Sequence, residues 1–196
     1  MQLPNSVLRQ TGFVGRRVAP LLGFLWRPQL NLSTLGRRVA LLEFLRWQVN
    51  CDVQATQHAY TVAAATPPWT CECDPCRNFR SLGMEAFPED FQKFCAAAGV
   101  DLHHPSEVYH SGRIAPGSHS YGGWFHIVGE LAAGRDGLLA VSPTGWLGDF
   151  EQLTPDFAVG LTARTVLVPY GFPSVGVVQL EFSTQLPWIL SSPERD

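Results

Sequence analysis

The hydrophobic pattern of this chain changes from a helical to an extended period at His104-Pro105, and no other feature constrains the fold as strongly. Before this point, two segments combine helix-start signals with apolar residues three and four positions apart. After it, short runs that alternate between apolar and polar residues are separated by turns rich in Pro, Gly and Ser. Short strands joined by tight turns favour antiparallel pairing. The sequence therefore predicts an α+β domain, in which two short helices pack on an antiparallel sheet of about five strands.

The boundaries of both helices can be predicted from local chemistry. Asp74-Pro75 offers an N-cap acceptor followed by a proline in the first turn, and the helix is expected to end near Gly83. Pro88-Glu89-Asp90 predicts a second start, because early acidic residues suit the positive end of the helix dipole. Gly99 is expected to end this helix as a left-handed cap. Its predicted buried stripe consists of Phe91, Phe94, Cys95 and Ala98.

The predicted strands follow one another along the rest of the chain. The longest is expected at residues 157–168, whereas residues 51–62 indicate a strand or an irregular segment. In the second strand, Phe125 and Ile127 are predicted to be buried, with His126 on the opposite face. The expected strands are residues 107–114, 121–131, 138–141, 145–150, 157–168 and 175–184.

Residues 1–48 differ in composition from the rest of the chain. The first fifty residues hold seven arginines and a single acidic residue, Glu43, whereas the chain as a whole has a net charge of −3. We therefore predict a boundary near Val49, with a basic N-terminal extension (1–48) and a single α+β domain (49–196). The apolar runs of the extension fall short of the roughly 20 residues that span a bilayer, so no transmembrane segment is expected. Three interpretations stay open: upstream DNA translated from a start codon placed too early, a targeting or membrane-surface segment, and an accessory helix pair.

Three cysteines at the start of the first predicted helix form the most informative motif. Cys71, Cys73 and Cys76 follow a C-x-C-x2-C pattern, and a helix amino terminus favours the thiolate form that binds metals. These residues are the predicted ligands of a metal site, most simply zinc. A structural zinc site takes four ligands, and the candidates for the fourth are Cys51, Cys95, His103 and His104.

Two other interpretations of the cluster stay open. Cys73 and Cys76 could act as a redox dithiol, although no parallel βαβ unit surrounds them as in thioredoxin-like proteins. Alternatively, the cysteines are small apolar residues that pack a helix on the sheet, which is the role expected of Cys95.

Other classes of site have weaker support. His126 and Glu130 could form an acid–base pair, but no nucleophile or oxyanion motif accompanies them. The chain lacks a G-x-S-x-G elbow, a phosphate-binding loop, G-x-G-x-x-G and H-E-x-x-H. Nucleic-acid binding is not expected, because the domain is acidic and Lys93 is its only lysine.

Several motifs together resemble a family of small uncharacterised bacterial proteins. They are the run from Cys71 to Phe79, Gly99-Val100-Asp101 with Pro105-Ser106-Glu107, Tyr121-Gly122-Gly123-Trp124, and Leu186-Pro187-Trp188. The resemblance covers roughly residues 50–190, and its most specific part is the cysteine-Arg-Asn-Phe run. It implies a bacterial, cytoplasmic protein and no particular chemistry.

The sequence thus predicts a non-enzymatic binding or interaction domain, with a protein or small-molecule partner and a structural zinc site at the cysteine cluster. The alternative is a redox or metal-dependent enzyme that uses the same cluster. Five cysteines without a convincing export signal favour a reducing compartment, hence the cytoplasm. An interaction domain should expose an apolar patch, whereas a metal enzyme should show an open coordination position facing a pocket.

Overall fold

The computed structural model describes residues 29–31, 39–64, 71–142 and 145–194. Within these ranges the chain forms three α-helices and one short 3-10 helix: α1 (Val53–Ala63), α2 (Asp74–Leu82), η1 (Gly83–Ala86) and α3 (Glu89–Ala98). The strands are β1 (Gln29–Asn31), β2 (Val39–Phe44), β3 (Trp47–Asp52), β4 (Glu107–Ala115), β5 (Ser118–Ala133), β6 (Leu138–Ala140), β7 (Trp146–Gly148), β8 (Glu151–Thr154), β9 (Phe157–Thr162) and β10 (Val177–Pro187).

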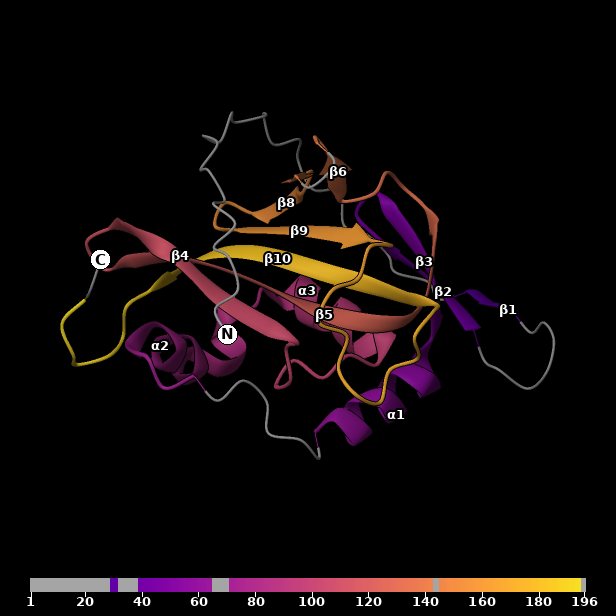
Figure 1. The fold of residues 1–196 in the computed structure, drawn as a ribbon, viewed down its shortest axis with the longest axis horizontal. Helices are drawn as coiled ribbons and strands as arrows, with labels where there is room; N and C mark the ends of the chain where they lie inside the picture. The colour runs from indigo at the N-terminus through magenta and orange to yellow at the C-terminus, as the bar shows by residue number, and fades with distance from the viewer. Residues whose placement is uncertain (1–28, 32–38, 65–70, 143–144, 195–196) are drawn as a thin grey trace.

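Eight of the strands form one antiparallel sheet. Its order is β1-β2-β3-β5-β10-β9-β8, with β4 paired to β5, and β6 and β7 form a separate hairpin. The two longest strands, β5 and β10, run side by side through the middle of the molecule (Figure 1). The prediction of an α+β fold is confirmed, although the sheet has more strands than expected.

The core lies between the sheet and the helices α2 and α3. The stripe predicted for α3 is buried, and its Phe91 ring lies 5.0–6.4 Å from five other phenylalanine rings. These rings come from β2, the segment before α3, and the central strands: Phe44, Phe87, Phe125, Phe157 and Phe182. Gly99 ends α3 in the left-handed conformation, with φ of 77°, as predicted.

Strand β5 pairs with two strands along the same edge, and α1 fills the gap between them. On this edge, residues 118–124 pair with β4 and residues 129–133 with β3, so the backbone between them has a strand partner only on the opposite edge, where it pairs with β10. The Tyr60 hydroxyl donates to the His126 carbonyl (3.0 Å) and accepts from the His126 N–H (3.1 Å). The Thr56 hydroxyl accepts from the Val128 N–H (3.0 Å). Side chains of α1 thus replace the missing strand bonds, as buried backbone groups require.

We expect Tyr60→Phe to lower the free energy of unfolding by about 2–4 kcal/mol, because it leaves a buried N–H and a buried C=O of His126 without a partner. The ring itself, which packs edge-on against Phe172, is retained. Thr61→Ala is the matched control, because Thr61 is an exposed hydroxyl residue of the same helix. Urea unfolding monitored by circular dichroism measures both variants. Equal losses for the two would show that the Tyr60 hydroxyl does not support β5.

Three sequence-based predictions need correction. Residues 51–62 form mainly a helix, α1, and its N-cap is Asp52, whose carboxylate accepts from the Ala55 N–H. The longest strand is β5, with 16 residues, whereas β9 has only six and ends at Thr162. The boundary predicted near Val49 falls inside β3, and residues 39–48 belong to the same sheet as β5. Residues 1–28 and 32–38 lie outside the described part of the chain.

Candidate metal centre

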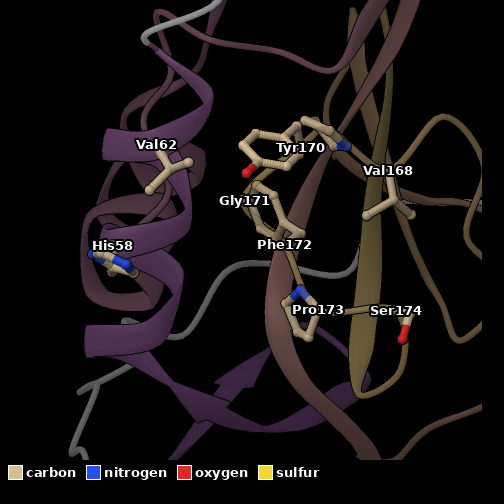
Figure 2. Close-up of a pocket in the computed structure, with 9 residues that line it drawn as sticks. His58, Val62, Val168, Tyr170, Gly171, Phe172, Pro173 and Ser174 are labelled. Carbon is tan, nitrogen blue, oxygen red and sulfur yellow. The ribbon is translucent and has the colours of Figure 1, made fainter.

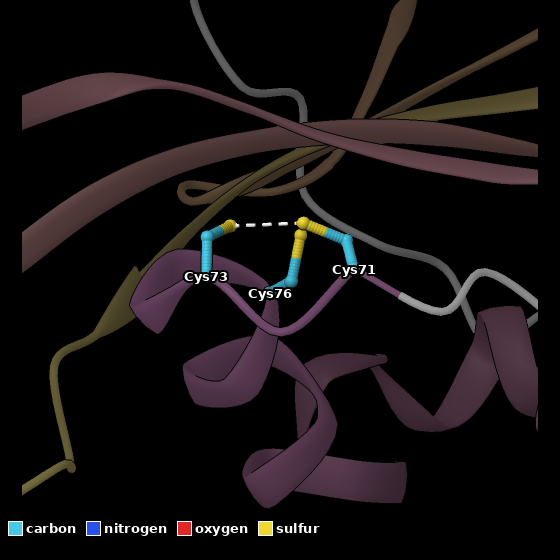
Figure 3. Close-up of side chains that lie close together, drawn as sticks. All are labelled: Cys71, Cys73 and Cys76. Carbon is cyan, nitrogen blue, oxygen red and sulfur yellow. Dashed lines mark hydrogen bonds between the residues drawn. The ribbon is translucent and has the colours of Figure 1, made fainter.

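The three clustered cysteines lie where an extended segment enters α2. Cys71 and Cys73 precede the helix, and Cys76 lies in its first turn. The predicted N-cap was wrong by one residue: α2 begins at Asp74, and the cap is Cys73 in an extended conformation. Asp74 instead forms an ion pair with Arg77 (3.0 Å) within the same turn. The chain bends at Cys73 as it enters α2, and the three side chains lie on one side of this bend (Figure 3).

The structure brings the three predicted ligands to one place. Their Sγ atoms all lie within 4.8 Å of one another, and those of Cys71 and Cys73 are 3.2 Å apart. Figure 3 shows the three side chains pointing toward one another from one side of the turn. Cys71 and Cys73 are exposed and Cys76 is half-buried, so the cluster can be reached from solvent.

The cluster holds one thiol poised to ionise and one that resists ionisation. A hydrogen bond from the backbone of Cys73 lowers the pKa of Cys71, helped by the side chains of Cys73 and Cys76 and by the charge of Arg80. Burial raises the pKa of Cys76, and hydrogen bonds to its two neighbours add to this shift. Cys71 is therefore expected to ionise before Cys76, and a metal ion must displace a proton from Cys76.

Hydrogen bonds from the sheet hold the first turn of α2 in place. The buried Asn78 amide donates to the Tyr121 hydroxyl (3.2 Å) and the Pro187 carbonyl (2.9 Å), and its oxygen accepts from the Ile189 N–H (2.8 Å). The Tyr121 hydroxyl in turn donates to the Pro75 carbonyl (3.2 Å). Sequence reasoning gave no role to Asn78 or Tyr121, although both belong to motifs in the family resemblance. They fix the helix start that presents Cys76.

None of the four residues considered as a fourth ligand joins the cluster. Cys51 lies in β3, where its thiol donates to the Ala98 carbonyl (3.4 Å) and burial raises its pKa to about 12. Cys95 is enclosed in the α3 stripe, and burial raises its pKa well above the usual range. His104 pairs with Asp101 (2.7 Å) and lies apart from the thiols, as does His103. Among the described residues, the cluster has three ligands.

The predicted acid–base pair of His126 and Glu130 does not form. His126 is fully buried, and its Nδ1 bonds to the hydroxyl of Ser106 (2.7 Å), whereas Glu130 is exposed. Burial lowers the pKa of His126 to about 4, opposed by the Gln179 side chain and the Val166 backbone. His126 is therefore neutral at physiological pH.

Two open grooves in the described structure lie away from the cysteines. One runs between α1, with His58 and Val62, and the loop of residues 168–174, as Figure 2 shows. The other lies beside Gln57 and Tyr60 of α1 and Gly99 after α3. Neither groove is lined by Cys71, Cys73 or Cys76.

Comparison of the chain with protein-family models, curated proteins and solved structures finds no match. The resemblance to a bacterial family therefore stays a prediction. None of the helices in the described ranges has the length and apolar character needed to cross a membrane.

Proposed function

We propose that Cys71, Cys73 and Cys76 bind one metal ion, most simply Zn²⁺, and that the domain is a binding or interaction module stabilised by that ion. The convergence of the three Sγ atoms within 4.8 Å carries this proposal. Tetrahedral zinc with Zn–S bonds of about 2.3 Å holds its sulfurs about 3.8 Å apart. The observed separations, 3.2 Å between Cys71 and Cys73 and at most 4.8 Å for any pair, differ from this value by an amount that rotation of the cysteine side chains can correct.

The surroundings of the cluster suit a bound thiolate complex. Three thiolates and Zn²⁺ carry one net negative charge, which the positive end of the α2 dipole stabilises. Arg80 adds a positive charge beside Cys71, where its guanidinium also donates to the Cys71 carbonyl (2.7 Å). The described residues supply three ligands, so water or a side chain of a binding partner completes the coordination.

Two surface features favour a binding role over catalysis. Neither of the two grooves described above is lined by the cysteines, so a metal bound at the cluster lies outside both of them. The loop between β9 and β10 exposes five large apolar side chains, as surfaces that bind partners often do. They are Val166, Leu167, Val168, Tyr170 and Val175.

One observation favours the alternative, a redox or metal-dependent enzyme working at the same cluster. The Sγ atoms of Cys71 and Cys73 are 3.2 Å apart, and the pKa of Cys71 is lowered, as expected of an attacking thiolate. In the redox form of this alternative, thiol–disulfide exchange takes the place of stable metal binding.

Metal analysis of protein purified without chelator tests the proposal. We expect about one zinc ion per chain, and Cys71→Ser, Cys73→Ser and Cys76→Ser should each lose most of it, because each removes one thiolate. Cys95→Ala is the matched control, since it removes a cysteine outside the cluster. Zinc affinity should fall as the pH is lowered, because protons compete for the thiolates and the raised pKa of Cys76 makes that proton hard to displace.

Two further measurements separate the alternatives. Chelation of the metal should lower the melting temperature of the wild-type protein if the ion is structural. Rapid reaction of Cys71 with a small disulfide, together with a metal-free protein of unchanged stability, would favour the redox enzyme. Metal content unchanged in all three serine variants would contradict the proposed site.

A further inference from the structure

The sheet face opposite the helices carries a patch that the cysteine cluster does not explain. Because strand side chains alternate between faces, the neighbours of the buried Val108, Phe125 and Phe182 point away from the core. We call the group formed by Glu107, Tyr109, Trp124 and Glu181 the aromatic–acid patch. It spans β4, β5 and β10, where β5 lies between the other two.

The patch contains two neighbouring aromatic rings. The Tyr109 and Trp124 ring centroids are 6.2 Å apart, with the rings inclined at 51°. Tyr109 lies directly on Gly122, where a Cβ atom would come within 2.4 Å of the tyrosine ring and hydroxyl. Gly122 therefore allows the ring to lie against the strand, and Tyr109 remains 38% exposed.

Two carboxylates flank the tryptophan. Trp124 is paired in register with Glu107 of β4 on one side and Glu181 of β10 on the other. The Gln179 amide donates to Glu181 (2.8 Å), while its oxygen accepts from the Val166 N–H (2.8 Å), which orients the Glu181 carboxylate. Burial raises the pKa of both carboxyl groups, and neither forms an ion pair with another described residue.

One nitrogen atom on this face has no hydrogen-bond partner among the described residues. It is Nε1 of Trp124, which is enclosed although the rest of the tryptophan side chain is half-buried. Unpaired polar atoms of this kind are rare in folded proteins, and they often indicate an absent water molecule or ligand. A hydroxyl group that enters beside Trp124 gains a hydrogen bond that the free protein lacks.

We propose that the aromatic–acid patch binds the ring of a neutral carbohydrate. The apolar face of a sugar packs on aromatic rings, and each sugar hydroxyl can accept from an indole N–H while donating to a carboxylate. The two acids disfavour phosphorylated or otherwise anionic ligands through charge repulsion. Half-buried carboxyl groups beside two aromatic rings and one unpaired indole N–H thus fit a polyhydroxylated, uncharged ligand better than a nucleotide.

A glycan array probed with the labelled full-length protein tests this inference, followed by calorimetric titration of the best neutral oligosaccharide. We expect Trp124→Ala, Tyr109→Ala and Glu181→Gln each to weaken binding at least about tenfold, because each removes one contact of the patch. Tyr170→Ala is the matched control, since this tyrosine is 80% exposed and lies in the loop between β9 and β10, outside the patch. Cys76→Ser should bind the glycan as the wild type does, which separates this inference from the metal site.

Near-ultraviolet circular dichroism is the control that tests whether each variant is folded. If Trp124→Ala unfolds, Tyr109→Ala and Glu181→Gln carry the test, because both side chains lie on the sheet surface. Three outcomes would overturn the inference: no neutral glycan bound by the wild-type protein, unchanged binding in the folded variants, or a preference for sulfated or sialylated glycans.

Discussion

A chain that begins at Val49 is expected not to fold, in contrast to the domain boundary that the charge pattern predicts. It lacks all of β2 and the start of β3, and with them the buried side chains of Leu42, Phe44 and Trp47. Each large apolar side chain of this kind contributes about 2–5 kcal/mol. Their combined loss is comparable to the whole stability of a typical domain, about 5–15 kcal/mol.

The shortened chain also loses an ion-pair network that joins the β2–β3 turn to β8. Arg46 pairs with Asp149 (2.7 Å) and Glu151 (2.5 Å) and lies over the Trp47 ring, 4.4 Å from its centroid. Circular dichroism melts of chains 49–196 and 29–196 test the prediction. The second keeps every described element and should melt cooperatively, whereas the first should not. A cooperative melt of chain 49–196 near the wild-type temperature would contradict this prediction and support a domain boundary at Val49.

Phe91→Ala should cause the largest loss of stability of any single substitution considered for this protein. Phe91 is fully buried in α3 and contacts five aromatic rings from the strands and the preceding segment. Truncating a buried phenylalanine costs about 3–5 kcal/mol, because it removes apolar contacts and leaves a cavity. For a chain of this length, each kcal/mol lowers the Tm by roughly 2–4 °C, so a fall of about 6–20 °C is expected.

Thermal and urea unfolding of the full chain measure this effect. Phe91→Leu should lose clearly less stability, because leucine fills most of the space, and Tyr170→Ala should change the Tm little, because its ring is exposed. A Phe91→Ala protein as stable as the Tyr170→Ala control would show that α3 does not pack on the sheet as described.

Elements with strong local signals were predicted correctly. The apolar stripe and glycine cap of α3 depend on residues within one or two turns, as does the turn between β4 and β5. Helix α1 was missed because one of the residues it buries is Thr56, a polar side chain that interrupts the apolar period. Its burial depends on Val128, 72 residues away, whose N–H needs an acceptor.

The length of β9 could not be predicted from its apolar residues. Val166 and Val168 continue the apolar character of β9, yet they lie in the loop toward β10, where the Val166 N–H bonds to the Gln179 side chain. Similarly, the strand alternation predicts that the His126 side chain points outward, but the side chain is fully buried and its Nδ1 is hydrogen-bonded to the Ser106 hydroxyl. Burial of an outer sheet face depends on which loop covers it.

Local residue patterns were enough to predict the starts of α2 and α3 to within one residue, the α+β class and the proximity of three thiols. A C-x-C-x2-C run at a helix start can bring its sulfurs together through local backbone geometry alone. Three features became clear only from the tertiary structure. Residues 39–48 belong to the sheet, and Cys51 and Cys95 lie in the core. Glu107 and Glu181 flank Trp124 on the neighbouring strands. These contacts join segments far apart in the chain, and they depend on the order of the strands in the sheet, which local residue patterns do not specify.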